Sequence, residues 1–284
     1  MKRSTWILGA IFLALSLVME ARERKEADGL FEEGINAFQE GNLKMAIERF
    51  EEIAQFSHSV NLYGNLGNLY HQITRYDKAV LNYRRALIMK ASSEDREAIE
   101  ASLQSVRKDA QLDTQDIESG FSYQHADIWT WASAAFFWLG LFSLVYLIRS
   151  KLSTLTKGSL AASSFALLVG GVVASCKSHQ NLKLLEREAV IVAPANEQGK
   201  ESVEFLNLSG KVLFTIRPGS IIRIDLDDKG AFKKRRIGEQ KDSSPATQAT
   251  TQECYFAHSL ADDRKGWVRK ENLEWIWVSN RFDR

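Results

Sequence analysis

Two long apolar runs without a charged residue interrupt an otherwise polar chain, at residues 128–148 and 158–176. A helix of either length, at about 1.5 Å rise per residue, covers a hydrocarbon core of roughly 30 Å. The segment between them carries Arg149, Lys151 and Lys157 and no acidic residue. Short loops rich in Lys and Arg stay in the cytoplasm. The pattern therefore predicts a transmembrane hairpin whose turn is cytoplasmic and whose two flanking regions lie outside the cytoplasm.

The N-terminus has the hydrophobic profile of a secretory signal. A basic start, Met1-Lys2-Arg3, precedes an apolar stretch over residues 6–19, and the chain turns polar from Glu20. The best small-x-small cleavage site, Met19-Glu20-Ala21, is a poor one, so the segment is either a cleaved signal peptide or a retained N-terminal anchor. Both alternatives export the region that comes after it. With the hairpin, they predict a membrane protein with both soluble domains on the side of the membrane away from the cytoplasm.

Residues 27–91 repeat with a period of 33, so that Gly34 recurs as Gly67. Small residues at fixed places let two helices approach closely, and the aromatic residues pack on the same face. This spacing resembles the tetratricopeptide repeat, in which the packing positions are Gly34, Ala46, Phe50, Gly67, Tyr70, Ala79, Tyr83 and Ala86. The likeness departs from the family at Ala37, which stands where Tyr70 stands, and at Ala91, where a proline is usual. Residues 93–110 predict a capping helix, because Ser93 can cap it and Glu94 and Asp95 suit its first turn.

The resemblance implies that the first helix of each repeat lines a groove for extended peptides. Asn65 and Asn68 occupy places where some family members hold a peptide backbone or carboxylate. Those members also use lysines where this chain has Phe31 and Ile35. Solvated asparagines on a scaffold helix are therefore the alternative.

From Arg187 the hydrophobic period changes to two. Alternating residues on both sides of Pro218-Gly219 predict two strands joined by a turn, and further short strands predict a small barrel. The order of strands and the Gly266-Trp267-Val268 sequence resemble bacterial SH3-like domains. The candidate groove of that domain comprises Tyr255, Trp267 and Trp275, although Trp267 suits the core equally well.

Small residues recur every fourth position in the second apolar run: Gly158, Ala162, Ala166, Gly170 and Ala174. In lipid, helices associate through the close packing that small side chains permit. The stripe predicts packing against the bulky first run or against a partner helix.

Composition excludes several classes of function. The net charge of +1 gives no general reason to expect nucleic acid. The chain has two cysteines, Cys176 and Cys254, and no histidines at metal-ligand spacing. Cys254 and His258 share a strand face but lie about 13 Å apart along it, too far for a catalytic dyad. The sequence therefore predicts no enzymatic site, cofactor or metal.

The order of parts gives a multidomain fold class: an α-helical tetratricopeptide solenoid, a two-helix transmembrane hairpin and a C-terminal all-β SH3-like barrel. The expected boundaries are 1–26 for the signal or anchor, 27–112 for the repeats, 113–126 for a linker, 127–148 and 158–176 for the spans, 149–157 for the loop, 177–186 for a second linker and 187–284 for the SH3-like domain.

This order resembles the BatE-like proteins of the Bacteroides aerotolerance (Bat) group over nearly the whole chain. The resemblance implies an adaptor anchored in the bacterial inner membrane, with both soluble domains on the periplasmic side and a role in stress or oxygen tolerance. Its implied partners are von Willebrand factor A-type membrane proteins of that group, associated with a MoxR-type ATPase. The alternative is a cell-wall sensor whose SH3-like domain binds peptidoglycan.

Overall fold

The computed structural model describes residues 25–89, 91–112, 123–149, 154–193, 202–238 and 251–277. Most of the expected signal segment and of the first linker lies outside these ranges, as does part of the expected loop between the two apolar runs.

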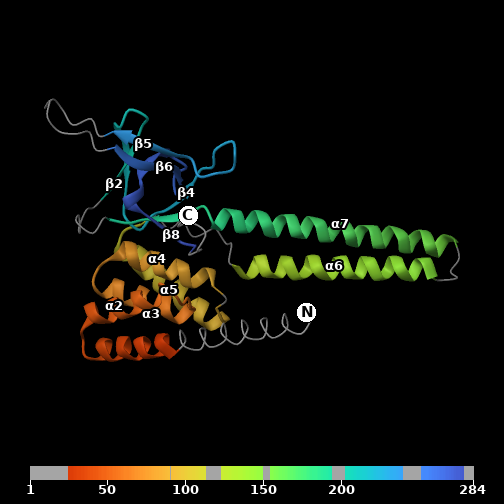
Figure 1. The fold of residues 1–284 in the computed structure, drawn as a ribbon, viewed down its shortest axis with the longest axis horizontal. Coiled ribbons are helices and arrows are strands. Elements are labelled where there is room, and N and C mark those ends of the chain that lie inside the picture. Colours follow the sequence, from red (N-terminus) through yellow and green to blue (C-terminus); the bar gives the residue numbers. More distant parts are fainter. Residues whose placement is uncertain are drawn as a thin grey trace, which may run out of the picture.

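The N-terminal half of the described chain is a stack of helices (Figure 1). A helix over residues 25–39 is followed by α2 (Leu43–Ile53), α3 (Val60–Gln72), α4 (Tyr76–Ile88) and α5 (Ser93–Asp109). Polar caps begin three of them, because the side chains of Asn42, Ser59 and Ser92 each accept a hydrogen bond from a backbone N–H in the first turn. The cap of α5 is Ser92, one residue before the expected Ser93.

The repeat seen in the sequence corresponds to a repeated packing contact. A Cβ atom on Gly34 would lie 2.6 Å from Cε1 of Phe50, and one on Gly67 would lie 2.6 Å from Cε1 of Tyr83. The same glycine-on-aromatic contact thus recurs after 33 residues of sequence. The residues expected to pack the repeat are all buried: Gly34, Ala46, Phe50, Gly67, Tyr70, Ala79, Tyr83 and Ala86.

Helices α6 (Tyr123–Arg149) and α7 (Thr154–Leu185) form a long hairpin that projects from the rest of the molecule (Figure 1). Their contact contains a hydrogen bond of 2.7 Å from the Ser164 hydroxyl to the Ser143 hydroxyl. A Cβ on Gly140 would meet Leu168 at 2.8 Å, so this glycine allows the two helices to approach. Helix α7 also continues through most of the stretch expected as a second linker, residues 177–186.

The small-residue stripe lies partly outside this helix contact. Ala174 is buried at 1% exposure and Gly170 is half-buried, whereas Ala162 and Ala166 are exposed. Gly158 is within α7, but its surroundings are outside the described residues. Large apolar side chains are exposed on both helices, among them Trp131, Trp138, Phe142, Phe165 and Val172.

No helix in the described part of the chain is both long enough and apolar enough to cross a membrane. The predicted transmembrane helices at 127–148 and 158–176 are thereby contradicted. The inner-membrane location, with soluble domains on its periplasmic side, is contradicted on the same ground.

The C-terminal part folds into an antiparallel sheet of eight strands. Seven of them follow the order β3-β2-β7-β6-β4-β1-β8, and the eighth, β5, pairs with β6. The strands are β1 (Glu188–Ile191), β2 (Val203–Leu206), β3 (Val212–Ile216), β4 (Ile221–Ile224), β5 (Lys234–Gly238), β6 (Thr251–Ser259), β7 (Lys265–Arg269) and β8 (Leu273–Trp275), with the 3₁₀ turn η3 (Lys270–Asn272) before β8. The period-two pattern correctly located β3 and β4 on either side of Pro218-Gly219.

The helices and the sheet share one hydrophobic core. Val190 of β1, Ile221 of β4 and Ile276 belong to the same buried cluster as the helical residues Val80, Leu87 and Leu103. A second cluster lies within the sheet and includes Ile191, Phe205, Ile222 and Val268. The fold is therefore a mixed helix-and-sheet assembly, and the predicted class, a transmembrane hairpin separating an α-helical solenoid from an all-β barrel, is wrong.

We predict that Gly67→Ala lowers the free energy of unfolding by about 1–3 kcal/mol, because the added methyl group overlaps the Tyr83 ring. Gly64→Ala is the matched control on α3, since a Cβ there meets nothing within 4 Å. It should raise stability by up to about 1 kcal/mol through helix propensity. Urea denaturation of both variants measures the difference, and equal effects would contradict the close packing.

Candidate functional site

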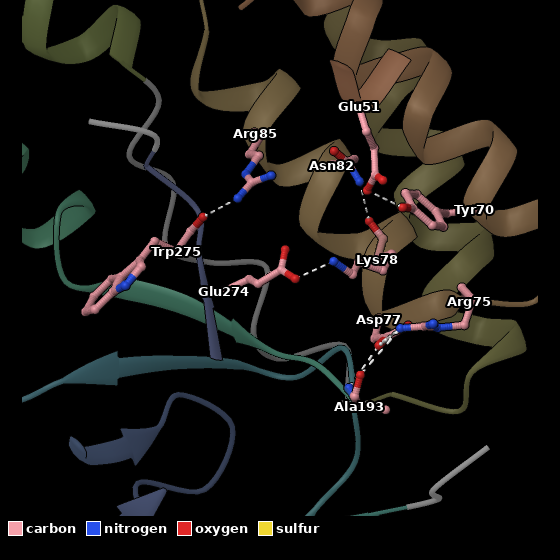
Figure 2. Close-up of polar contacts among 10 residues, drawn as sticks. All are labelled: Glu51, Tyr70, Arg75, Asp77, Lys78, Asn82, Arg85, Ala193, Glu274 and Trp275. Atoms are coloured by element: carbon pink, nitrogen blue, oxygen red, sulfur yellow. Dashed lines mark hydrogen bonds and ion pairs between the residues drawn. The ribbon is translucent and has the colours of Figure 1, made fainter. Parts of the chain in front are cut away.

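Helix α4 is the element that joins the helical stack to the sheet. The Asp77 carboxylate, in its first turn, accepts a hydrogen bond from the backbone N–H of Ala193 at 3.0 Å. It also accepts from Nε and a terminal nitrogen of Arg75, each at 3.1 Å. Asp77 is 4% exposed, and its hydrogen bonds raise the pKa of the Arg75 guanidinium. The charge is therefore buried but well paired (Figure 2).

Further ionic contacts follow along α4. The Lys78 ammonium pairs with the Glu274 carboxylate of β8, and the Arg85 guanidinium donates to the backbone carbonyl of Trp275 at 2.9 Å. Deeper in the interface, Arg84 lies 3.4 Å and Arg223 lies 2.9 Å from the buried Glu188 carboxylate. Long side chains of α4 thus hold β1 and β8 in a defined position.

A polar pocket of about 260 Å³ opens where these contacts meet. Its walls come from both parts of the fold, since Glu51, Gln55 and Asn82 belong to the helical stack and Glu274 to the sheet. Lys78 and Arg85 line it as well, and Leu66 and Ala54 supply its apolar surface. We call this the junction pocket.

Some polar groups of the junction pocket already have hydrogen-bond partners within the protein. The Tyr70 hydroxyl donates to the Glu51 carboxylate, and burial together with that bond raises the pKa of Tyr70, so the phenol stays protonated. Asn82 donates to the backbone carbonyl of Lys78 at 2.8 Å. Two cations, two carboxylates and two amides line the pocket and present donors and acceptors for a polar chain such as a peptide. Among the described residues, no group of His, Cys, Asp and Glu side chains is placed to hold a metal ion.

The two asparagines of the expected peptide groove lie on α3. Asn68 is exposed, but its side-chain oxygen accepts a hydrogen bond of 2.6 Å from the Tyr83 hydroxyl. Asn65 is half-buried. One lone-pair site of Asn68 is thus occupied by the neighbouring helix, while the rest of its amide remains accessible.

The three aromatics of the expected SH3-like groove separate into two groups. Tyr255 and Trp275 lie together with ring centroids 5.9 Å apart, and Phe232 completes this cluster at 4.8 Å from Trp275. Trp267 lies on the opposite face of the sheet, where it contacts Phe256 at 5.2 Å. Tyr255 and Phe256 are adjacent on β6 and therefore point to opposite faces. The three residues do not form one groove.

Cys254 and His258 have different partners and do not contact each other as a dyad. His258 Nδ1 lies 3.1 Å from the Asp225 carboxylate. Cys254 is 1% exposed, and desolvation raises the pKa of its thiol. A thiol that resists ionisation is a poor nucleophile.

Sequence reasoning missed the residues that line the junction pocket. Lys78, Asn82 and Arg85 follow one face of α4 at spacings of four and three residues, which is a detectable helical stripe. The sequence around Glu274 gives no sign that it pairs with Lys78, because the two residues are 196 positions apart.

The fold and site define a class of protein: a helical stack fixed to an antiparallel sheet, with a polar pocket at their junction. Comparison with protein families, with curated proteins and with solved structures gives no match for this chain.

We expect Asp77→Ala to destabilise the fold by about 1–3 kcal/mol for each buried partner left unsatisfied. The variant leaves the Ala193 N–H without this acceptor and Arg75 without its carboxylate. Hydrogen exchange should speed up in both α4 and β1. Asp109→Ala is the control, because Asp109 pairs with His71 at a surface position where ion pairs contribute little. Unchanged exchange in β1 would show that Asp77 does not couple the two parts.

A second expectation concerns thiol reactivity. Cys176 is exposed and Cys254 is buried with a raised pKa, so iodoacetamide at pH 8 should alkylate Cys176 at least tenfold faster. Mass spectrometry of a time course measures both rates in one sample. Comparable rates, or faster reaction at Cys254, would contradict the burial and the raised pKa of this thiol.

Proposed function

We propose that this protein is a non-enzymatic adaptor that binds a protein partner across the junction of its helical stack and its sheet. The single observation that carries the proposal is the junction pocket, whose lining comes from both parts. A partner segment seated there contacts α2, α4 and β8 together. Because the two parts share a core and are linked by buried ion pairs, that partner meets one rigid surface.

The chemistry of the pocket suits a polypeptide segment. The Arg85 guanidinium attracts carboxylates and the Glu51 carboxylate attracts cationic groups, while Lys78 and Glu274 form an ion pair with each other in the pocket wall. Leu66 and Ala54 offer a limited apolar surface. A segment of mixed charge satisfies such a lining better than a uniformly charged polymer does.

The resemblance to the Bat group supplies the candidate partner. On that basis we expect a von Willebrand factor A-type protein of the group, and a role in oxygen or stress tolerance. A cell-wall sensor that binds peptidoglycan is the competing function. Its support is the partly exposed Phe232–Tyr255–Trp275 cluster, because aromatic faces pack against sugar rings as apolar surfaces.

The test is a binding assay with the purified full chain against two ligands, a von Willebrand factor A-type protein from the same organism and purified cell-wall sacculi. We expect saturable binding to the protein, weakened at least tenfold by Gln55→Trp. Gln55 is an exposed residue of the pocket wall, so a large side chain there fills the pocket without disturbing the core.

Glu48→Trp is the matched control, because Glu48 is an exposed residue of α2 that does not line the pocket. The control should bind as the parent does. Co-sedimentation with sacculi and no binding to the protein would replace the adaptor by the cell-wall sensor. An equal loss of affinity in both variants would show that the partner does not bind at the junction pocket.

A further inference from the structure

A second concave surface lies on the sheet, on the face opposite the second sheet cluster that includes Phe205 and Val268. It has a volume of about 400 Å³. Residues Leu206, Phe256 and Trp267 form its floor, and Leu208, Leu213 and Lys265 form its rim. We call it the outer groove.

The floor of the outer groove is a cross-strand row. Leu206 of β2 pairs directly with Trp267 of β7, and Trp267 pairs directly with Phe256 of β6. Directly paired residues of antiparallel strands point to the same face, so these three side chains lie side by side across the strands. Trp267 is 5% exposed and Leu206 is 5% exposed, so the floor is packed and rigid.

The rim exposes large apolar side chains. Leu208 is 62% exposed and Leu213 is 53% exposed, and Val212, next to the rim in the sequence but outside the groove lining, is 50% exposed. They occupy the β2–β3 turn and the start of β3, where the pairing of the two strands shifts register between Phe205 and Leu206. Such an irregularity redirects side chains at the edge of a sheet. A contiguous apolar rim above an apolar floor is typical of an interaction surface.

Strand β3 is an edge of the sheet, because within the described residues it pairs with β2 alone. Every second residue of an antiparallel edge strand directs its N–H and C=O away from its partner. An extended segment that lies along β3 can pair with these groups while one of its side chains enters the adjacent groove.

The charge in the groove lining is positive, and the nearest acidic residue on this face of β2, Glu204, pairs with Arg269 at 3.9 Å. Lys265 is the charged residue of the lining, and the Lys233 ammonium lies 4.4 Å from the centroid of the Phe256 ring. Lys211 is exposed next to Val212, at the end of the β2–β3 turn. A basic rim attracts acidic side chains and steers their approach.

We propose that the outer groove is a docking site for an acidic, extended segment of a partner protein, which adds along β3 and places one bulky apolar side chain between Leu213 and Trp267. The proposal rests on the adaptor function and gives it a second, separate binding surface. The apolar floor selects for Leu or an aromatic residue, and the lysines select for flanking Asp or Glu.

The experiment is a selection of random ten-residue display peptides on the folded full chain, followed by fluorescence polarisation with the enriched peptides. Leu213→Glu and Lys265→Glu are the test variants, because both residues are exposed and can change without loss of core packing. Lys44→Glu on α2 is the matched control, since it makes the same charge change at an exposed residue outside the groove. Circular dichroism confirms the fold of each variant.

Support for the proposal is enrichment of peptides that combine Asp or Glu with one bulky apolar residue. Their affinity should fall at least tenfold in Leu213→Glu and in Lys265→Glu and stay within twofold in Lys44→Glu. A repeat selection on Lys265→Glu should enrich less acidic peptides.

Peptides that bind Leu213→Glu as well as they bind the parent would overturn the proposal, as would neutral or basic selected peptides. If those peptides instead lose affinity in Gln55→Trp, the adaptor function stands and only the outer groove is removed. Self-association that Leu213→Glu abolishes in sedimentation velocity would assign the groove to a second copy of the chain and overturn the proposal as well.

Discussion

The carboxylate of Asp77 is bound at the point where helix α4 meets the loop after β1, and it accepts from both the Ala193 backbone and the Arg75 guanidinium. Around it, Lys78, Arg84 and Arg85 reach Glu274, Glu188 and the Trp275 carbonyl. These contacts use fixed, desolvated partners, so they define orientation as well as proximity. The junction pocket exists only because this orientation is held, since its wall combines residues from α2, α4 and β8.

The sheet has two faces with different roles. One face carries Phe205, Ala257 and Val268, and completes the buried clusters. The other carries Leu206, Trp267 and Phe256, and it forms the floor of the outer groove. The alternation of β6 makes this division unavoidable, because Tyr255 and Phe256 must point in opposite directions. This division gives the proposed adaptor two separate surfaces on one body.

The hairpin of α6 and α7 shows the difference between composition and packing. Its helix contact is built from Gly140, Leu168 and the Ser164–Ser143 hydrogen bond, whereas Ala162 and Ala166 of the regular small-residue stripe are exposed. A spacing of four residues drifts around a helix that turns every 3.6 residues, so one stripe cannot follow a straight contact over many turns. The stripe was visible in the sequence, but the line of contact was not.

Local patterns in the sequence determined much of the fold. The period of 33 located the glycine-on-aromatic contacts, and the period of two located β3, β4 and their turn, because both signals depend on residues close in the chain. The expected groove of Tyr255, Trp267 and Trp275 does not form, because Trp267 lies on the opposite face of the sheet from the other two. Which residues of different strands share a face depends on the register of strand pairing. The association of α4 with β1 and β8 was decided only by tertiary structure. Lys78 and Glu274 are 196 residues apart, and no local periodicity links side chains that meet through the closure of a shared core.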